Sequence, residues 1–408
     1  MDSITTPVIE GGPSGPLSPY VGQYVSLVQA QGYVRKSVRY HLSLLVHFDA
    51  WLARTRRSLS DVNEALIEKF LDPRVRTKWV HVSAPATMRR LLTMLRRFGV
   101  TPPAPMPGLS PTQQLTKNYE RYLVEERALS QKTADAWTPY VTRFLTEKFS
   151  GGLLDLSSLN APDVTAFIQR HARRHGCSYT RKLVVSMRSF LGYLRYQGLN
   201  DADLAKAVPK VARWSLATLP KHLSARDVQR VLDSCDRRRR LGRRNYAILL
   251  LLARLGLRAG EVVRLTLDDL DWEASRIAVC GKGGRSAQLP LPADVAQAIA
   301  RYLRQDRPQC SSRSVFIRGR APHCGLTGAN AIAKIVFCAL RNAGVVSARK
   351  GAHLLRHSLA TDMLRHGASL DEIGEILRHK SPDSTAIYAK VDLVALRSLA
   401  LAWPGGVR

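Results

Sequence analysis

Apolar residues recur at helical spacing in the first two hundred residues of the chain, and the same pattern occurs twice. Leu44 and Phe48 fall on one face of a helix that begins near Ser37. Tyr140 and Phe144 repeat this pair 96 residues later. Because residues four apart lie on the same face of a helix, the pattern predicts two similar helical bundles in tandem.

The last helix of each repeat ends in a similar way. The stretch LRRFGV at 95–100 has its counterpart in LRYQGL at 194–199. Gly99 and Gly198 stand where a glycine commonly ends a helix, because glycine adopts the left-handed conformation without strain. These ends support the interpretation of the two segments as versions of one unit.

The pattern changes in the last part of the chain. Ser224 is a candidate cap for a helix at 226–235, and the apolar run 246–253 predicts a buried helix over 245–255, with the basic run 237–240 as a loop before it. From residue 293 onward the pattern is again mostly helical. The fold class is therefore mainly α with a small antiparallel β-sheet, whose strand-like runs lie at 271–272, 276–279 and 288–291, with a glycine turn at 281–284.

Two proline-rich stretches separate these regions, since proline cannot continue a helix. No run of about 18 apolar residues predicts a membrane span, and the N-terminus lacks the order of a secretory signal. The expected organisation is a flexible tail at 1–18, a helical bundle at 19–100, a linker at 101–111, a second helical bundle at 112–208, a linker at 209–222, a mixed domain at 223–391 and a tail helix at 392–408.

The chain is strongly basic, with a formal net charge of +30 over 408 residues. A folded protein with this charge usually binds a polyanion, although a ribosomal-type protein or an arginine-rich genome would give the same balance. Arginines seven apart share a helix face, and we expect these stripes to contact DNA phosphates rather than only solvent. The candidate DNA-binding residues are Arg89, Arg96, Arg181, Arg188 and Arg195.

Cysteine spacing and acidic residues give little support for a metal or nucleotide cofactor. Six scattered cysteines without a CxxC pair predict reduced thiols in the cytoplasm. The carboxylates at 268–271 do not have the arrangement of a two-metal site, and a GxxxxGK[ST] phosphate loop is missing. We therefore expect no cofactor and no small-molecule partner.

Two arginines adjoin apolar helical sequence in the C-terminal region. Arg258 follows LLLLARLGL, and Arg356 follows His353-Leu354-Leu355. A buried guanidinium is costly unless it meets an anion, and its planar fork matches two phosphate oxygens. The pair is thus a candidate clamp for a phosphodiester.

A tyrosine and two histidines complete this candidate chemistry. Tyr388 is the candidate nucleophile; it follows the polar stretch 381–385, which argues against a place in the core. Its phenol, with an ordinary pKa of about 10, needs a base, and His353 or His379 is expected to accept the proton. Lys282, in a glycine turn, is placed to protonate the departing oxygen.

In this order, the motifs Gly-Leu-Arg-x-x-Glu, a turn lysine, His-x-x-Arg-His and a histidine nine residues before a tyrosine resemble the tyrosine recombinase (phage integrase) family. The resemblance implies a catalytic domain at 223–391, a core-binding domain at 112–208, and N-terminal helical bundles of the SAM-like type. It also implies cleavage through a 3′-phosphotyrosyl intermediate without metal or ATP. It also implies roles for single residues. Arg258 and Arg356 clamp the scissile phosphate, Lys282 is the general acid, and Tyr388 attacks the phosphorus. His353 is an acid or base, His379 orients the phosphate or the nucleophile, and Glu261 and His357 support the site.

The resemblance implies double-stranded DNA as substrate and a homotetramer on two duplexes, with the tail helix docking on a neighbouring subunit. Arg378 departs from the family pattern, which usually has glycine before the second histidine. The bundle at 19–100 is an addition whose role is DNA contact or assembly. Integration, excision or transposition of a mobile element is the leading hypothesis; alternatives are chromosome or plasmid dimer resolution, a type IB topoisomerase, and an accessory protein that binds DNA without cutting.

Overall fold

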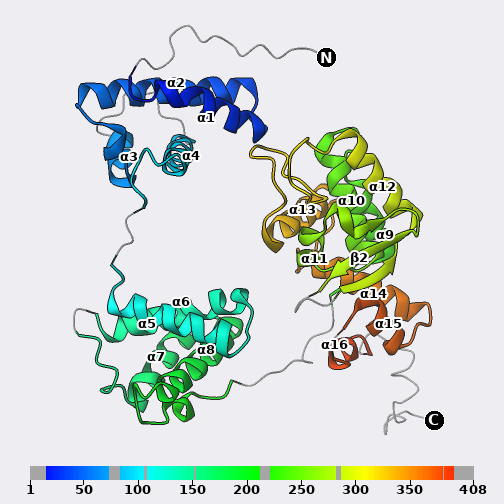
Figure 1. The fold of residues 1–408 in the computed structure, drawn as a ribbon. Coiled ribbons are helices and arrows are strands. Elements are labelled where there is room, and N and C mark those ends of the chain that lie inside the picture. Colours follow the sequence, from blue (N-terminus) through cyan, green and yellow to red (C-terminus); the bar gives the residue numbers. More distant parts are fainter. Residues whose placement is uncertain are drawn as a thin grey trace, which may run out of the picture. The chain divides into compact units, whose positions relative to one another are not determined.

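The computed structural model describes residues 15–72, 83–104, 108–150, 153–211, 221–281, 286–379 and 381–389. The chain divides into two compact units (Figure 1). One unit is Met106–Ala217, and the other comprises Met1–Pro105 and Thr218–Arg408. In the described part of the chain, no helix combines the length and the apolar content that a bilayer crossing requires.

The first segment forms a bundle around Phe48, which is fully buried with Leu45 and Leu52. Leu44 and Phe48 both point into this core, so the predicted helix face is confirmed. The apolar positions of four helices close over one another because each presents its buried stripe to the same centre. The elements are α1 (Ser18–Ala30), α2 (Arg35–Arg54), η1 (Leu59–Asp61), α3 (Glu64–Leu71) and α4 (Ala84–Arg97).

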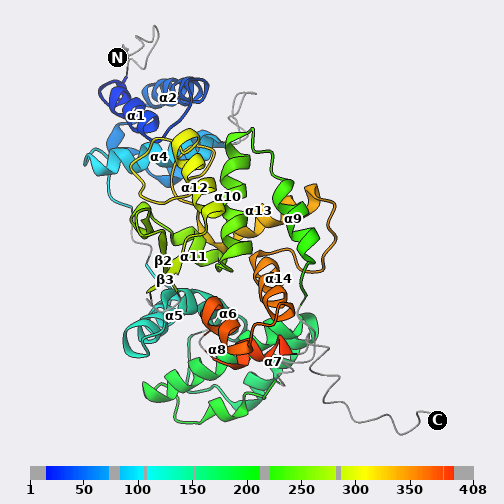
Figure 2. The ribbon, with the colours of Figure 1, turned by 90° about the vertical axis from the view of Figure 1, so that its right-hand side faces the viewer.

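The second unit is also helical (Figure 2). Its core contains Tyr119, Phe144 and Phe190. Phe144 lies on the predicted face of its helix, with Tyr140 partly buried against the same core. The elements are α5 (Pro111–Arg121), η2 (Tyr122–Glu126, a π-helical turn), α6 (Gln131–Lys148), α7 (Ala161–Arg174), α8 (Cys177–Tyr196) and η3 (Leu204–Ala207).

Both predicted glycine helix ends are present. Gly99 has φ +70° and Gly198 has φ +66°, the left-handed region that other residues avoid. The N–H of Leu199 then donates to the carbonyl of Leu194, as in a Schellman motif.

The C-terminal segment contains the sheet, in the order β1-β2-β3 with both pairs antiparallel. Ile277 pairs with Leu270 on one side and Leu289 on the other, which confirms the predicted strands. The turn at 282–285 lies outside the described residues. The elements are α9 (Ala225–Asp233), α10 (Arg240–Arg254), α11 (Ala259–Arg264), η4 (Leu267–Asp269), β1 (Leu270–Asp271), β2 (Arg276–Cys280), β3 (Ser286–Pro290), α12 (Ala293–Gln305), α13 (Gly328–Asn342), α14 (Ala352–Arg365), α15 (Leu370–Leu377) and α16 (Asp383–Ala386).

Helix α10 begins at Arg240, five residues before the start that the apolar pattern predicted. Its first turns are polar but have tertiary partners. A guanidinium nitrogen of Arg243 lies 2.8 Å from Asp306 at the end of α12, and Arg244 donates to the carbonyl of Ile317 at 2.8 Å. These contacts help to extend α10 over 241–244, which the sequence pattern left unassigned, whereas 237–239 lie in the predicted loop.

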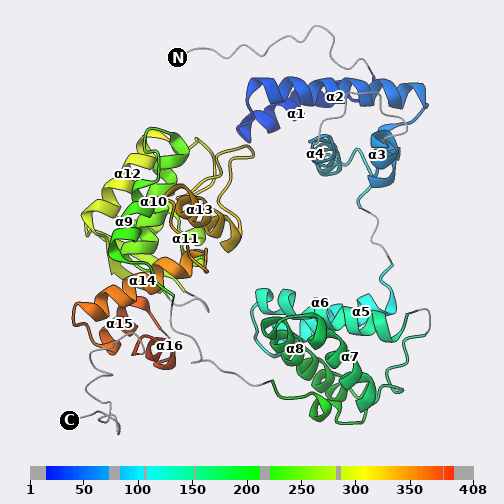
Figure 3. The ribbon, with the colours of Figure 1, turned by 180° about the vertical axis from the view of Figure 1, so that it is seen from behind.

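Two clusters of buried residues fill this segment. The larger one surrounds α10, whose residues 247–253 are all buried, as the apolar run predicted. The smaller one lies among α14, α15 and α16 (Figure 3) and comprises Ala360, Ile373, Leu377 and Tyr388. The site described next lies where the smaller cluster meets the start of α11.

Candidate active site

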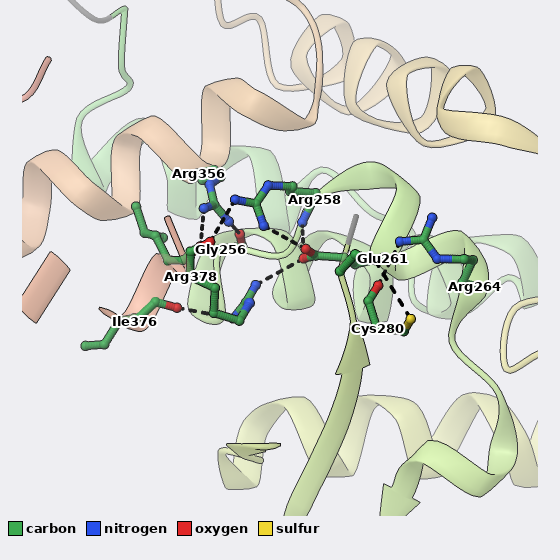
Figure 4. A network of polar contacts seen from close by, with 10 residues as sticks. Gly256, Arg258, Glu261, Arg264, Cys280, Arg356, Ile376 and Arg378 are labelled. Atoms are coloured by element: carbon green, nitrogen blue, oxygen red, sulfur yellow. Dashed lines mark hydrogen bonds and ion pairs between the residues drawn. The ribbon is translucent and has the colours of Figure 1, made fainter. Parts of the chain in front are cut away.

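Arg258 precedes α11 in an extended conformation and is held by Glu261 one turn later. Its backbone N–H donates to one carboxylate oxygen, Oε2, at 2.8 Å, and its guanidinium donates to the other, Oε1, at 2.8 Å (Figure 4). A second nitrogen of the same guanidinium donates to the carbonyl of Arg378 at 3.1 Å. One third of the side chain of Arg258 remains exposed.

Glu261 is the buried carboxylate of the site, with only 1% of its side chain exposed. Its Oε2 also accepts from the guanidinium of Arg378, at 3.0 Å. Burial by itself would raise the pKa of Glu261, but the hydrogen bonds from Arg258 and the charge of Arg378 outweigh burial and lower that pKa. The carboxylate is therefore ionised at neutral pH, and its supporting role stays a prediction.

Arg356 lies on α14 and is 4% exposed. Its guanidinium donates to two main-chain carbonyls, that of Gly256 at 2.5 Å and that of Leu377. Burial, together with the charges of Arg258 and Arg378, lowers the pKa of Arg356 to about 10. A buried cation that is held by neutral carbonyls is a strong site for an anion.

Two histidines lie one turn apart on α14. The ring of His353 is at the surface of the site; desolvation, followed by the charges of Arg356 and Arg258, lowers its pKa. His357 is partly buried, and its Nδ1 lies 2.8 Å from the hydroxyl of Tyr388. Burial, followed by the neighbouring His353, lowers the pKa of His357 to about 4, so the ring is neutral at pH 7.

Tyr388 follows the short helix α16, and its ring belongs to the apolar cluster of α14 and α15. It is 1% exposed, and burial raises the pKa of its hydroxyl to about 12. The expectation that Tyr388 lies outside the core is therefore wrong. Polar residues before Tyr388 form α16. The polarity of this neighbouring stretch therefore did not predict that the side chain of Tyr388 is buried.

The contact partner of Tyr388 also differs from the expectation. We expected His353 or His379 beside its hydroxyl, but the hydrogen-bond partner is His357. His379 instead has its Nδ1 2.6 Å from the hydroxyl of Thr385, and its ring stacks at 6.4 Å on that of Tyr388. Burial, followed by the charge of Arg356, lowers the pKa of His379 to about 4.

One contact of the site was missed in the sequence. The ion pair of Arg378 with Glu261 was not predicted, although the position was noted as unusual. Its signal in the sequence was an arginine where the family usually has glycine, and one more arginine is a weak signal in a chain this basic. Lys282 lies outside the described residues, and its role as general acid stays a prediction.

The candidate DNA-binding arginines of α4 have partners within the chain. The Nε of Arg89 donates to the carbonyl of Pro85 on its own helix, at 3.3 Å. Arg96 makes two hydrogen bonds to the carboxylate of Glu64, at 2.6 and 2.8 Å. DNA contact by this pair stays a prediction, with the charge of Arg96 largely offset by Glu64.

The three arginines of α8 differ in their surroundings. Arg181 is exposed. Arg188 donates to the carbonyl of Val208 at 3.0 Å, and Arg195 forms an ion pair with Asp203 at 3.0 Å. Of the three, Arg181 is the most direct candidate for phosphate contact.

Residues 221–393 match the model of the phage integrase family. A protein of Sinorhizobium fredii (strain NBRC 101917 / NGR234), described as integrase/recombinase y4rA, is 44% identical over 395 residues, which is 96% of each chain. The chain belongs to the phage integrase family. As a member, it is a tyrosine-type site-specific recombinase.

Another relative matches a smaller share of this phage integrase family member. Tyrosine recombinase XerD of Listeria monocytogenes serotype 4b (strain F2365) is 31% identical over 293 residues, which is 70% of this chain and 96% of XerD. Among solved structures, the XerH site-specific recombinase in a post-cleavage complex with palindromic difH substrate has a TM-score of 0.56 at 17% identity, covering 96% of this chain and 97% of that one. This last likeness shows a shared fold.

Proposed function

We propose that the chain cuts and rejoins double-stranded DNA at specific sites, with Tyr388 as the nucleophile. The observation that carries the proposal is the hydrogen bond between the hydroxyl of Tyr388 and His357. His357 follows the buried Arg356 directly on α14. The DNA complex of XerH supports DNA as the substrate of a chain with this fold.

In the proposed reaction, the Oη of Tyr388 attacks the scissile phosphorus and its proton passes to Nδ1 of His357, 2.8 Å away. The bond from phosphorus to the 5′ oxygen breaks, which leaves a 3′-phosphotyrosyl link and a 5′-hydroxyl protonated by Lys282. Arg258 and Arg356 stabilise the charge on the non-bridging oxygens. The link preserves the energy of the phosphodiester, so the reverse attack rejoins DNA without ATP.

The three histidines have distinct roles in the proposed reaction. With a pKa of about 4, His357 is neutral at pH 7 and can accept a proton, provided that its own proton lies on Nε2. His379 stacks on the ring of Tyr388 and orients it, and His353 at the surface of the site assists as acid or base.

We further propose that the chain acts in the integration, excision or transposition of a mobile element, as a homotetramer on two duplexes in the cytoplasm. The match to the integrase/recombinase y4rA spans 96% of the chain, and therefore includes the first bundle, whereas XerD matches 70%. Chromosome or plasmid dimer resolution is the second candidate, because XerD still matches along 96% of its own length.

The test is recovery of covalent protein–DNA adducts. The purified chain is incubated with sheared genomic DNA, denatured in detergent, and the DNA that stays bound is sequenced. We expect one enriched sequence from the wild type, none from Tyr388→Phe, and equal gel-shift affinity for both chains. Adducts that persist in Tyr388→Phe would show that another residue is the nucleophile.

The two roles are distinguished by products. With the recovered site on a plasmid and on a second DNA, a mobile-element enzyme joins the two molecules. An enzyme for dimer resolution acts mainly on two sites in direct repeat within one circle.

A further inference from the structure

Arg378 has an unusual backbone for a residue with a side chain. It ends α15 in the left-handed conformation, with φ 55° and ψ 52°. Such a conformation is strained for a residue with a side chain, whereas glycine adopts it freely. An arginine at this position therefore carries a cost that its side chain must offset.

The side chain of Arg378 is directed into the site, with 14% of it exposed. One guanidinium nitrogen donates to Oε2 of Glu261 at 3.0 Å, and another donates to the carbonyl of Ile376 at 3.2 Å (Figure 4). Its Nε is buried, without a hydrogen-bond partner among the described residues. The ion pair with Glu261 is thus the principal contact that this buried group gains.

The main chain of the same residue contacts the other side of the network. The carbonyl of Arg378 accepts from Arg258, and the carbonyl of Leu377, one residue earlier, accepts from Arg356. The left-handed turn thereby presents two consecutive carbonyls to the two candidate phosphate-binding arginines. Arg378 is linked to Arg258 twice, directly through its carbonyl and indirectly through Glu261.

The charges explain why a third guanidinium matters here. Glu261 offers one negative charge to Arg258 and Arg378 together, with its Oε1 bonded to the guanidinium of Arg258 and its Oε2 shared between Arg378 and the N–H of Arg258. Without Arg378, the full charge of this buried carboxylate would act on Arg258. Arg258 would then be held more tightly by Glu261 and would attract an incoming phosphate less.

We propose that Arg378 is a positioning residue of DNA cleavage: by sharing Glu261, it leaves the charge of Arg258 available to the scissile phosphate and fixes the orientation of its fork. The role rests on the proposed function, since it requires that Arg258 binds the phosphate. It acts on the cleavage step rather than on general DNA affinity, because Arg378 itself is largely covered.

The central experiment compares Arg378→Gly with Arg56→Gly. Arg56 is an exposed arginine of the first bundle with φ 53°, so glycine there relieves the same backbone strain away from the site. Adduct formation is measured in a single turnover at saturating concentrations of the DNA fragment recovered above. We expect Arg378→Gly to slow adduct formation about 10- to 100-fold, the loss of one hydrogen bond to a charged group, and Arg56→Gly to change it less than about twofold.

Two further variants separate positioning from folding. Arg378→Lys keeps a cation beside Glu261 and should recover part of the rate. In a Glu261→Gln background, Arg378→Gly should change the rate less than about threefold, because its effect passes through the carboxylate. Thermal unfolding of Arg378→Gly should match the wild type or occur at a higher temperature, since strain is relieved.

Equal rates for Arg378→Gly and the wild type would overturn this role while leaving the proposed function intact. An equal loss from Arg378→Gly with and without the Glu261 carboxylate would also overturn it, because the two residues would then act independently. A wild-type chain that forms no adduct would contradict the proposed function itself.

Discussion

At the scale of single residues, the site is organised by hydrogen bonds that no motif specifies. The sequence predicted Arg258, Arg356 and Tyr388 as reacting groups, because each residue type suits attack on a phosphodiester. It did not predict that Arg356 donates to main-chain carbonyls or that His357 contacts the hydroxyl of Tyr388. Such contacts depend on how α14, α15 and α16 pack, and packing joins residues that are 21 to 100 positions apart.

The contact between His357 and Tyr388 leads to a prediction about the proton acceptor. Replacing His357 by phenylalanine keeps an aromatic ring in the cluster but removes the nitrogen 2.8 Å from the hydroxyl. We expect single-turnover adduct formation at saturating DNA to fall about 10²- to 10⁴-fold, the usual contribution of a general base. DNA affinity in a gel shift should stay unchanged, and adduct formation at the wild-type rate would show that the proton goes to another group.

At the scale of elements, periodicity and caps predicted the long helices well. The faces of α2 and α6, the cap of α9 and the glycine ends of α4 and α8 all follow from local preferences. Elements that are stabilised by tertiary contacts were harder to predict from the sequence. The early start of α10 depends on Asp306, and the short α16 lies in a stretch that reads as a polar loop.

One glycine lies inside α8 and another follows its end, and we expect alanine at the two positions to change the stability of the helix in opposite directions. Gly192 lies inside the helix, is exposed and has free space around it, so Gly192→Ala should stabilise the helix by about 0.5–1 kcal/mol. Gly198 has equally free space but φ +66°, so Gly198→Ala should destabilise it by about 1 kcal/mol or more. Hydrogen exchange of the amides in 177–196, measured in the full chain, reports both changes.

The comparison isolates backbone conformation, because both substitutions add the same methyl group to open space. A Gly198→Ala variant as stable as the wild type, or more stable, would contradict the assignment of Gly198 as a left-handed helix end. Destabilisation by Gly192→Ala would contradict the expectation for an exposed helical glycine in open space.

At the scale of the whole molecule, a net charge of +30 is enough to predict a polyanionic partner from composition alone. Charge does not predict which arginines are available to that partner. Within the described residues, Arg96 and Arg195 form ion pairs with acidic partners, whereas Arg181 is exposed. Sequence patterns place arginines on a helix face, but the neighbouring carboxylates that offset them come from other elements.

This difference predicts unequal effects on DNA binding for two arginines of the same helix. Each phosphate neutralised by an arginine contributes about −0.9 to the slope of log affinity against log salt concentration. We expect Arg181→Gln to reduce the magnitude of that slope by about one and to weaken binding to all sequences alike. Arg195→Gln should change the slope less, because Asp203 already offsets its charge at 3.0 Å. Titrations of a fluorescent duplex at several salt concentrations measure both slopes, and an unchanged slope for Arg181→Gln would place the phosphate-binding surface elsewhere on the chain.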